Sequence, residues 1–214
     1  MLACALFAAS ALGGQQTQKA VNVRLPSTES ALDIAEANEP NAATVSVTGD
    51  GTTYFGVTPM TPDALATELS HRSHEKKVFI KADASAPYVA VESAVNAVRN
   101  AGFSDCIFLT SQYEMPAGSR ILPKGLEVWL KSTVRPKTPR VELTKGSESA
   151  PTLKINGRPV AWSSLQNTLT TILGNQIDRK AVIKAEGMLP FEQIMHAIDV
   201  ANSIGADVIL QPQS

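Results

Sequence analysis

One segment of this 214-residue chain occurs twice, at positions 78–102 and again at 181–205. The two copies, VFIKADASAPYVAVESAVNAVRNAG and AVIKAEGMLPFEQIMHAIDVANSIG, align without a gap. Identical or conservative pairs include Lys81/Lys184, Asp83/Glu186, Pro87/Pro190, Tyr88/Phe191 and Gly102/Gly205, and upstream pairs are Pro59/Pro159, Leu65/Leu165 and Leu69/Leu169. A correspondence in which prolines, glycines and apolar positions keep their order predicts a tandem duplication.

Each copy belongs to a unit with its own order of expected elements. The first unit should contain a hairpin around the Gly-Asp-Gly turn at 49–51, a helix from Pro62, a strand within 76–83, a helix from Pro87 to Gly102, and a strand at 105–111. Thr61 is the expected N-cap of the first helix. The expected apolar helix faces are Ala64, Leu65, Ala66 and Leu69, then Tyr88, Val91, Ala94, Val95 and Val98.

The second unit repeats this order. Its expected elements are a hairpin with a longer turn at 140–157, a helix carrying Leu165, Leu169 and Ile172, a strand at 180–186, a helix from Pro190 to Gly205, and a strand at 206–212. Strand–helix–strand units of this kind require right-handed parallel crossovers. We therefore predict an α/β (α+β) fold of two tandem small ββαβαβ two-layer sandwiches, each with two helices on one face of a mixed sheet.

Composition suggests the remaining boundaries. The predicted segments are 1–14, an apolar partial transmembrane helix or signal segment; 15–44, a linker with the extended Leu-Pro element VNVRLP; 45–112, the first unit; 113–140, a linker whose apolar run LEVWL should join a sheet; and 141–214, the second unit. A membrane-spanning helix needs about 20 apolar residues, so the first segment is too short as written. A clipped signal peptide and the end of a longer membrane helix both remain possible, and either one places the rest of the chain outside the cytoplasm.

The search for reactive chemistry is negative. The net charge is −1, with 19 basic and 20 acidic residues, so no electrostatic footprint for nucleic acid is present. Cys106 lies in an apolar run and is expected to be a buried thiol. His71 and His74 lack a third ligand for zinc, and His196 has no counterpart in the other copy. We predict no enzymatic activity, no catalytic residue, no cofactor and no metal site.

The acids at the ends of the repeated strands have two interpretations. Asp83 and Glu186 each end a buried strand just before a proline that begins a helix. Strand ends can face a shared surface where a partner binds. Alternatively, the acid caps the following loop while Lys81 or Lys184 extends its ammonium group into water, and we favour this second interpretation.

The order of these motifs resembles the periplasmic domain of the ExbD/TolR family. The resemblance rests on a strand ending in Ala-Asp, a helix ending in Ala-Gly, the sequence Asn156-Gly157 followed by Pro159-Val160 and a Leu165-x-x-x-Leu169 helix, and the upstream Leu25-Pro26. It covers nearly the whole chain when two copies of the domain are counted. Because no single motif is specific, the order of all of them carries the resemblance.

The resemblance implies a biopolymer transport role. Family members are single-span inner-membrane proteins with a periplasmic domain, and they act as homodimers with an ExbB/TolQ-like proton-channel protein and a TonB/TolA-like periplasmic protein. They use an aspartate in the membrane helix, whereas the first acid here is Glu29, so the resemblance implies a truncated or divergent start. The candidate partner-binding residues are Leu25, Pro26, Asp83, Tyr88, Glu186 and Phe191.

Two other functions stay open at this point. The chain could be a secreted periplasmic binding or scaffolding module that derives from this domain but is uncoupled from the motor. It could also be a small-molecule-binding regulatory protein, because paired ββαβαβ units can bind ligands between them.

Overall fold

The computed structural model describes residues 21–72, 77–111, 122–131, 134–146, 150–174 and 176–212. The apolar start, His74, much of the expected linker between the units and the tip of the second hairpin lie outside these ranges. None of the helices within the described ranges has the length and hydropathy needed to cross a bilayer.

The first half of the chain, residues 43–110, has the expected order of elements. Its elements are β2 (Ala43–Val47), β3 (Thr53–Phe55), β4 (Thr58–Pro59), α1 (Pro62–Ser70), β5 (Val78–Ala82), α2 (Tyr88–Asn100) and β6 (Asp105–Thr110). Thr61 is the N-cap of α1 as predicted, because its hydroxyl accepts a hydrogen bond from the Ala64 N–H at 3.3 Å. Helix α2 begins at Tyr88, one residue later than expected, and Pro87 is its N-cap.

The second half, residues 140–210, has the same order. Its elements are β8 (Arg140–Thr144), β9 (Thr152–Ile155), β10 (Arg158–Val160), the 3-10 turn η2 (Trp162–Ser164), α3 (Leu165–Leu173), β11 (Lys180–Ala185), α4 (Phe191–Ser203) and β12 (Asp207–Leu210). Asn156 and Gly157 have positive φ angles of 52° and 78°, as the tight turn between β9 and β10 requires. The short strands β4 and β10 were not predicted.

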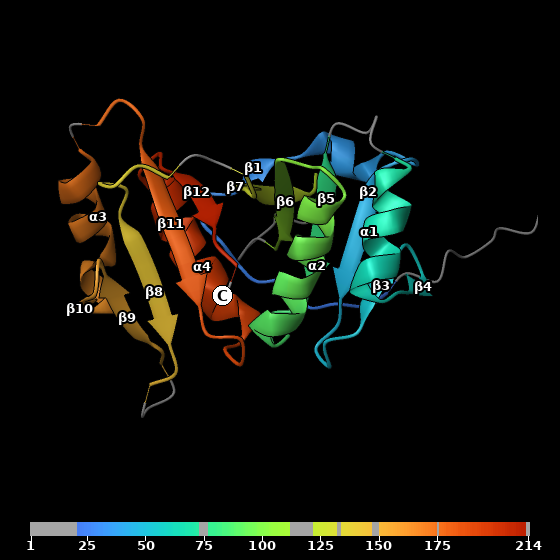
Figure 1. Ribbon diagram of the computed structural model, residues 1–214, viewed down its shortest axis with the longest axis horizontal. Coiled ribbons are helices and arrows are strands. Elements are labelled where there is room, and N and C mark those ends of the chain that lie inside the picture. The colour runs from blue at the N-terminus through green and yellow to red at the C-terminus, as the bar shows by residue number, and fades with distance from the viewer. Residues whose placement is uncertain are drawn as a thin grey trace, which may run out of the picture.

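The strands of both halves join one mixed sheet, which runs across the molecule in Figure 1. Its order in the described residues is β10-β9-β8-β11-β12-β7-β6-β5-β2-β3-β4, with the short β1 (Leu32–Asp33) also paired to β7 (Lys124–Trp129). Strand β7 is the predicted LEVWL strand. It is antiparallel to β6 and parallel to β12, so it covers an edge of each half. The mixed α/β class is confirmed, but one continuous sheet replaces the two separate sheets that we expected.

Buried residues from α1, α2, α3 and α4 belong to one apolar core. Leu65, Leu69, Leu165 and Leu169 are fully buried in it, as the helical spacing predicts. One detail of the predicted faces is wrong, because Ala64 is exposed. Ile172 is partly buried and packs against the core as predicted, and the neighbouring Leu173, which was not predicted, is buried. A smaller cluster of Phe79, Ile107 and Leu109 contacts Leu25, Ile34, Ala37 and Ala42 from the segment before β2, which includes the 3-10 turn η1 (Ala35–Asn38).

Candidate functional site

The two halves meet where their second helices begin, a region that we call the seam (residues 84–89 and 187–192). Pro87 and Pro190 form an antiparallel bridge there. Tyr88 N–H donates to the Leu189 carbonyl at 2.9 Å, and Phe191 N–H donates to the Ala86 carbonyl at 2.9 Å. Each bond maps onto the other through the alignment of the two copies, so the seam has the reciprocal pairing of a two-fold interface.

A second pair of seam bonds has the same reciprocity. Val89 N–H donates to the Gly187 carbonyl at 2.7 Å, and Glu192 N–H donates to the Ala84 carbonyl at 2.9 Å. Behind these bonds, Tyr88 is 1% exposed and Phe191 is fully buried. The rings of Phe108 and Phe191 lie 5.0 Å apart, centroid to centroid. Aromatic contact and backbone bonds therefore hold the two halves together at one place.

Burial changes the titration of groups around the seam. It raises the pKa of Tyr88 well above the usual value, with a smaller contribution from the charge of Glu92. It lowers the pKa of Arg99, which still donates from Nε to the Leu130 carbonyl and from Nη2 to the Leu210 carbonyl, each at 3.0 Å. Arg99 thus joins α2 of the first half to the residue after β7 and to the end of β12.

The Leu-Pro element lies in a segment that we call the strap (residues 24–30). Ser111 N–H donates to the Pro26 carbonyl at 2.9 Å, and the Thr28 hydroxyl donates to the Thr110 hydroxyl at 2.9 Å. At its other end, the N–H groups of Glu29 and Ser30 each donate to the Asp199 carboxylate at 2.9 Å. Since Ser111 follows β6 and Asp199 is on α4, the strap contacts both halves of the chain.

Asp83 fixes the beginning of the strap. Its carboxylate accepts hydrogen bonds from Arg24 N–H at 2.8 Å and from the N–H and hydroxyl of Ser85 at 2.9 and 2.7 Å, while Ala84 N–H donates to the Arg24 carbonyl at 2.7 Å. Burial raises the pKa of Asp83, but these bonds and the Arg24 charge outweigh it, so the pKa lies below its ordinary value. The acid therefore caps its loop, as our favoured interpretation holds, and it also binds the strap.

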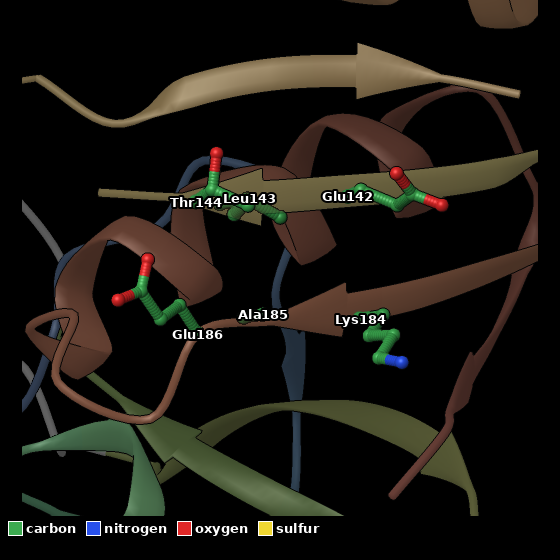
Figure 2. Close-up of a pocket in the computed structure, with 6 residues that line it drawn as sticks. All are labelled: Glu142, Leu143, Thr144, Lys184, Ala185 and Glu186. Carbon is green, nitrogen blue, oxygen red and sulfur yellow. The ribbon is translucent and has the colours of Figure 1, made fainter. Parts of the chain in front are cut away.

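Glu186, the counterpart of Asp83, has a different environment. Its carboxylate accepts a hydrogen bond from Lys145 N–H at 2.6 Å, and it lies at a cavity of about 350 Å³. The lining residues are Glu142, Leu143, Thr144, Lys184, Ala185 and Glu186. Figure 2 shows Thr144 and Glu186 beside each other at the ends of β8 and β11, with Glu142 and Lys184 further back on the same strands. Among the described residues, no segment comparable to the strap covers the equivalent position in this half.

The structure brings only some of the predicted site residues together. Leu25 and Pro26 lie in the strap with Asp83 at its start, and Pro26 is buried. Tyr88 and Phe191 are buried in the seam, so their side chains pack inside the protein and are not exposed on its surface. Glu186 lies apart at its own cavity. Sequence reasoning missed Asp199, although its position four residues after the buried Met195 placed a lone acid on an apolar helix face.

The remaining candidates that the structure describes are His71, His196 and Cys106. His71 and His196 are exposed, and the His196 ring lies 5.2 Å from that of Trp162. Cys106 is buried as predicted, and burial raises the pKa of its thiol strongly. In the described part of the chain, no three His, Cys, Asp or Glu residues are grouped as metal ligands would be.

Comparison with known proteins identifies the family. The family model described as biopolymer transport protein ExbD/TolR matches residues 4–113, just over half of the chain. The chain belongs to the ExbD/TolR family. The match includes the strap and the first half but not the second half. ExbD/TolR proteins are membrane-anchored, non-enzymatic accessory proteins of biopolymer transport that generally work with ExbB/TolQ and TonB/TolA. No curated protein and no solved structure matches the chain.

Proposed function

We propose that this ExbD/TolR protein is an accessory subunit of an inner-membrane complex that uses the proton-motive force, of the ExbB-ExbD-TonB or TolQ-TolR type. Its described residues would form the periplasmic, partner-binding part, and a single membrane-spanning segment would precede them. Its partners would be an ExbB/TolQ-like channel protein and a TonB/TolA-like periplasmic protein. The observation that carries the proposal is the family match, which spans the first half and the strap.

The strap gives this role a physical basis. It lies close to the beginning of the described chain, and it is hydrogen-bonded both to the first half, at Asp83, and to the second half, at Asp199. A displacement applied to the chain before the strap would therefore act on both halves together. Such a connection suits a subunit that passes movement from a membrane to partners outside it.

The second half extends this proposal. The matched order of elements and the reciprocal seam bonds support an origin by tandem duplication, with boundaries near 45–112 and 141–214. The seam then provides within one chain a contact of the kind that two identical domains make with each other. The homodimer implied by the family resemblance would bring four such domains together.

Purification of the native, full-length protein from its own membranes tests the proposal. We expect an ExbB/TolQ-like protein to co-purify, and intact mass together with N-terminal sequencing should show a membrane-retained form. A soluble form that begins near Leu12 or Gln15, without any such partner, would contradict it. That result would instead identify a secreted periplasmic binding or scaffolding module.

A further inference from the structure

The two halves share one corner of their structure, at the carboxyl ends of two parallel strands. In the first half, Val47 of β2 pairs with Ala82 of β5, and in the second half Leu143 of β8 pairs with Ala185 of β11. This register makes Glu142 the counterpart of Ser46, Glu186 that of Asp83, and Gly187 that of Ala84. We call these positions the first corner (Ser46, Thr48, Lys81, Asp83, Ala84) and the second corner (Glu142, Thr144, Lys184, Glu186, Gly187).

The first corner binds the extended backbone of the strap. Arg24 presents both of its backbone groups to it: its N–H donates to the Asp83 carboxylate at 2.8 Å, and its carbonyl accepts from Ala84 N–H at 2.7 Å. The Leu25 side chain then packs against Phe79, Ile107 and Leu109. The corner therefore recognises the N–H and the carbonyl of one residue through a carboxylate and an N–H, and it recognises the next residue through an apolar contact. Any extended segment with an apolar residue at that next position can satisfy this pattern.

The second corner has the same two groups, and within the described residues no segment equivalent to the strap lies on them. Oε2 of Glu186 accepts a hydrogen bond from Lys145 N–H at 2.6 Å, which leaves Oε1 as a further acceptor for a bound segment. Glu186 provides the carboxylate, and Gly187 N–H makes no hydrogen bond within the described residues. Glu142 is partly exposed beside the cavity of about 350 Å³, whereas its counterpart Ser46 is 4% exposed. In Figure 2 the carboxylate of Glu142 and the ammonium group of Lys184 point away from each other.

The chain order explains why this corner is open. Before β2, the chain supplies the strap, β1 and η1 to the first half. Before β8, the corresponding stretch supplies β7, which lies on the far side of β12 from β11. An exposed Met188, at the position of Ser85, stands next to Gly187 and offers apolar surface there.

We infer that the second corner is a binding site for an extended peptide segment of a partner protein, held by Glu186 and the Gly187 N–H as the strap is held by Asp83 and Ala84. The bound segment presents one free backbone N–H and carbonyl, followed by an apolar residue. The inference deepens the proposed partner-binding role. That the corner binds an extended peptide follows from its geometry, and only the assignment of this peptide to a partner protein rests on the proposed function.

A peptide with the sequence of the strap is the direct probe. A fluorescent peptide of residues 21–28, VNVRLPST, is titrated against the purified full-length chain and followed by anisotropy. We expect saturable binding that Glu186→Gln weakens about tenfold, the usual size of a charge-assisted hydrogen bond. N-methylation of the peptide nitrogen at the Arg24 position should abolish binding, because it removes the donor. The matched control is N-methylation at the Asn22 position, just before the strap, whose N–H makes no hydrogen bond within the described residues, and it should leave affinity unchanged.

Three outcomes would overturn the inference. One is no binding by the full-length chain. Another is binding that Asp83→Asn removes and Glu186→Gln does not, because the peptide would then be replacing the chain's own strap. The third is concentration-dependent self-association that Glu186→Gln abolishes, which would assign the corner to a second copy of the chain. Since this measurement needs no ExbB/TolQ-like protein, its failure is distinguishable from failure of the proposed motor role.

Discussion

Pro87 and Pro190 face each other as an antiparallel pair, and each is the N-cap of the second helix in its own half. Their neighbours exchange backbone hydrogen bonds in reciprocal pairs, and the strap adds another connection between the halves. Proline lacks an N–H and is therefore tolerated where a helix begins. The residues on either side of each proline remain free to pair across the seam.

Asp199 of α4 should be the residue on which the strap depends most. It is 7% exposed, and it accepts bonds from the Glu29 and Ser30 N–H groups and from the Ser30 hydroxyl. Because Asp199→Ala leaves these donors without their acceptor, we expect a loss of about 2–3 kcal/mol in the free energy of unfolding. Urea denaturation measures this loss, and trypsin cleavage after Arg24 should become faster. The exposed Asp207→Asn is the control and should change stability by less than about 0.5 kcal/mol. Unchanged cleavage in Asp199→Ala would show that the strap does not depend on this residue.

The helices could be predicted well because the residues that cap a helix or form its apolar face lie only a few positions apart in the sequence. The Thr61 cap and the spacing of Val91, Val95 and Val98 are visible within single turns, and the structure confirms them. The short strands β4 and β10 escaped prediction, since each contains a proline, Pro59 or Pro159, which usually argues against a strand.

The connections between the halves could not be predicted in the same way. Nothing in LEVWL specifies that β7 pairs with β6 on one side and β12 on the other, because pairing between distant strands leaves no periodic signal. The strap is similar, since its bonds use backbone groups that every residue carries. The repeat identified Asp83 and Glu186 as equivalent, but only the structure shows that the first binds the strap and the second borders a cavity.

Asp83 should make the free energy of unfolding depend on pH. Its pKa is lowered in the folded state, so it contributes stability above the unfolded-state pKa of about 4, and this contribution is lost as pH falls through the lower folded-state pKa. We expect Asp83→Asn to be less stable than the native chain at pH 7 and equally stable at pH 2. Chemical denaturation across this range tests the expectation. A constant difference between the two proteins at every pH would contradict it.

Cys106 should react only when the first half opens. The thiol is fully buried, and burial raises its pKa. In the folded protein a reagent therefore cannot reach the sulfur, and the reactive thiolate form is scarcely populated. In a Cys4→Ser background, Ellman's reagent at pH 8 should react with Cys106 only in denaturant. Ser203→Cys, at an exposed position near the end of α4, provides a control thiol that should react within minutes without denaturant. Equal reaction rates at the two positions would contradict the expectation.

Two glycines that end the second helices should differ in their cost of substitution. Gly102 has a φ of 107° and Gly205 one of 73°, and an added Cβ at either meets no close atom. The cost of alanine is therefore backbone strain alone. Because 73° is nearer to the left-handed region that L-residues can occupy, we expect about 1 kcal/mol for Gly205→Ala and about 2 kcal/mol for Gly102→Ala. Thermal unfolding should rank them in this order, and the reverse order would contradict the argument.

Phe191 should determine whether the two halves unfold together. Its fully buried ring contacts Phe108 of the first half, so Phe191→Ala removes packing from a core that both halves share. We expect a loss of about 3–5 kcal/mol in the free energy of unfolding, with Phe191→Leu losing less.

Tryptophan fluorescence reports on β7 and the second half through Trp129 and Trp162, while Cys106 labelling reports on the first half. If the seam makes one cooperative unit, both transitions should shift to the same lower denaturant concentration. Met188→Ala, at an exposed position of the same seam, should shift neither. A fluorescence transition that moves while the labelling transition stays in place would show that the halves unfold independently.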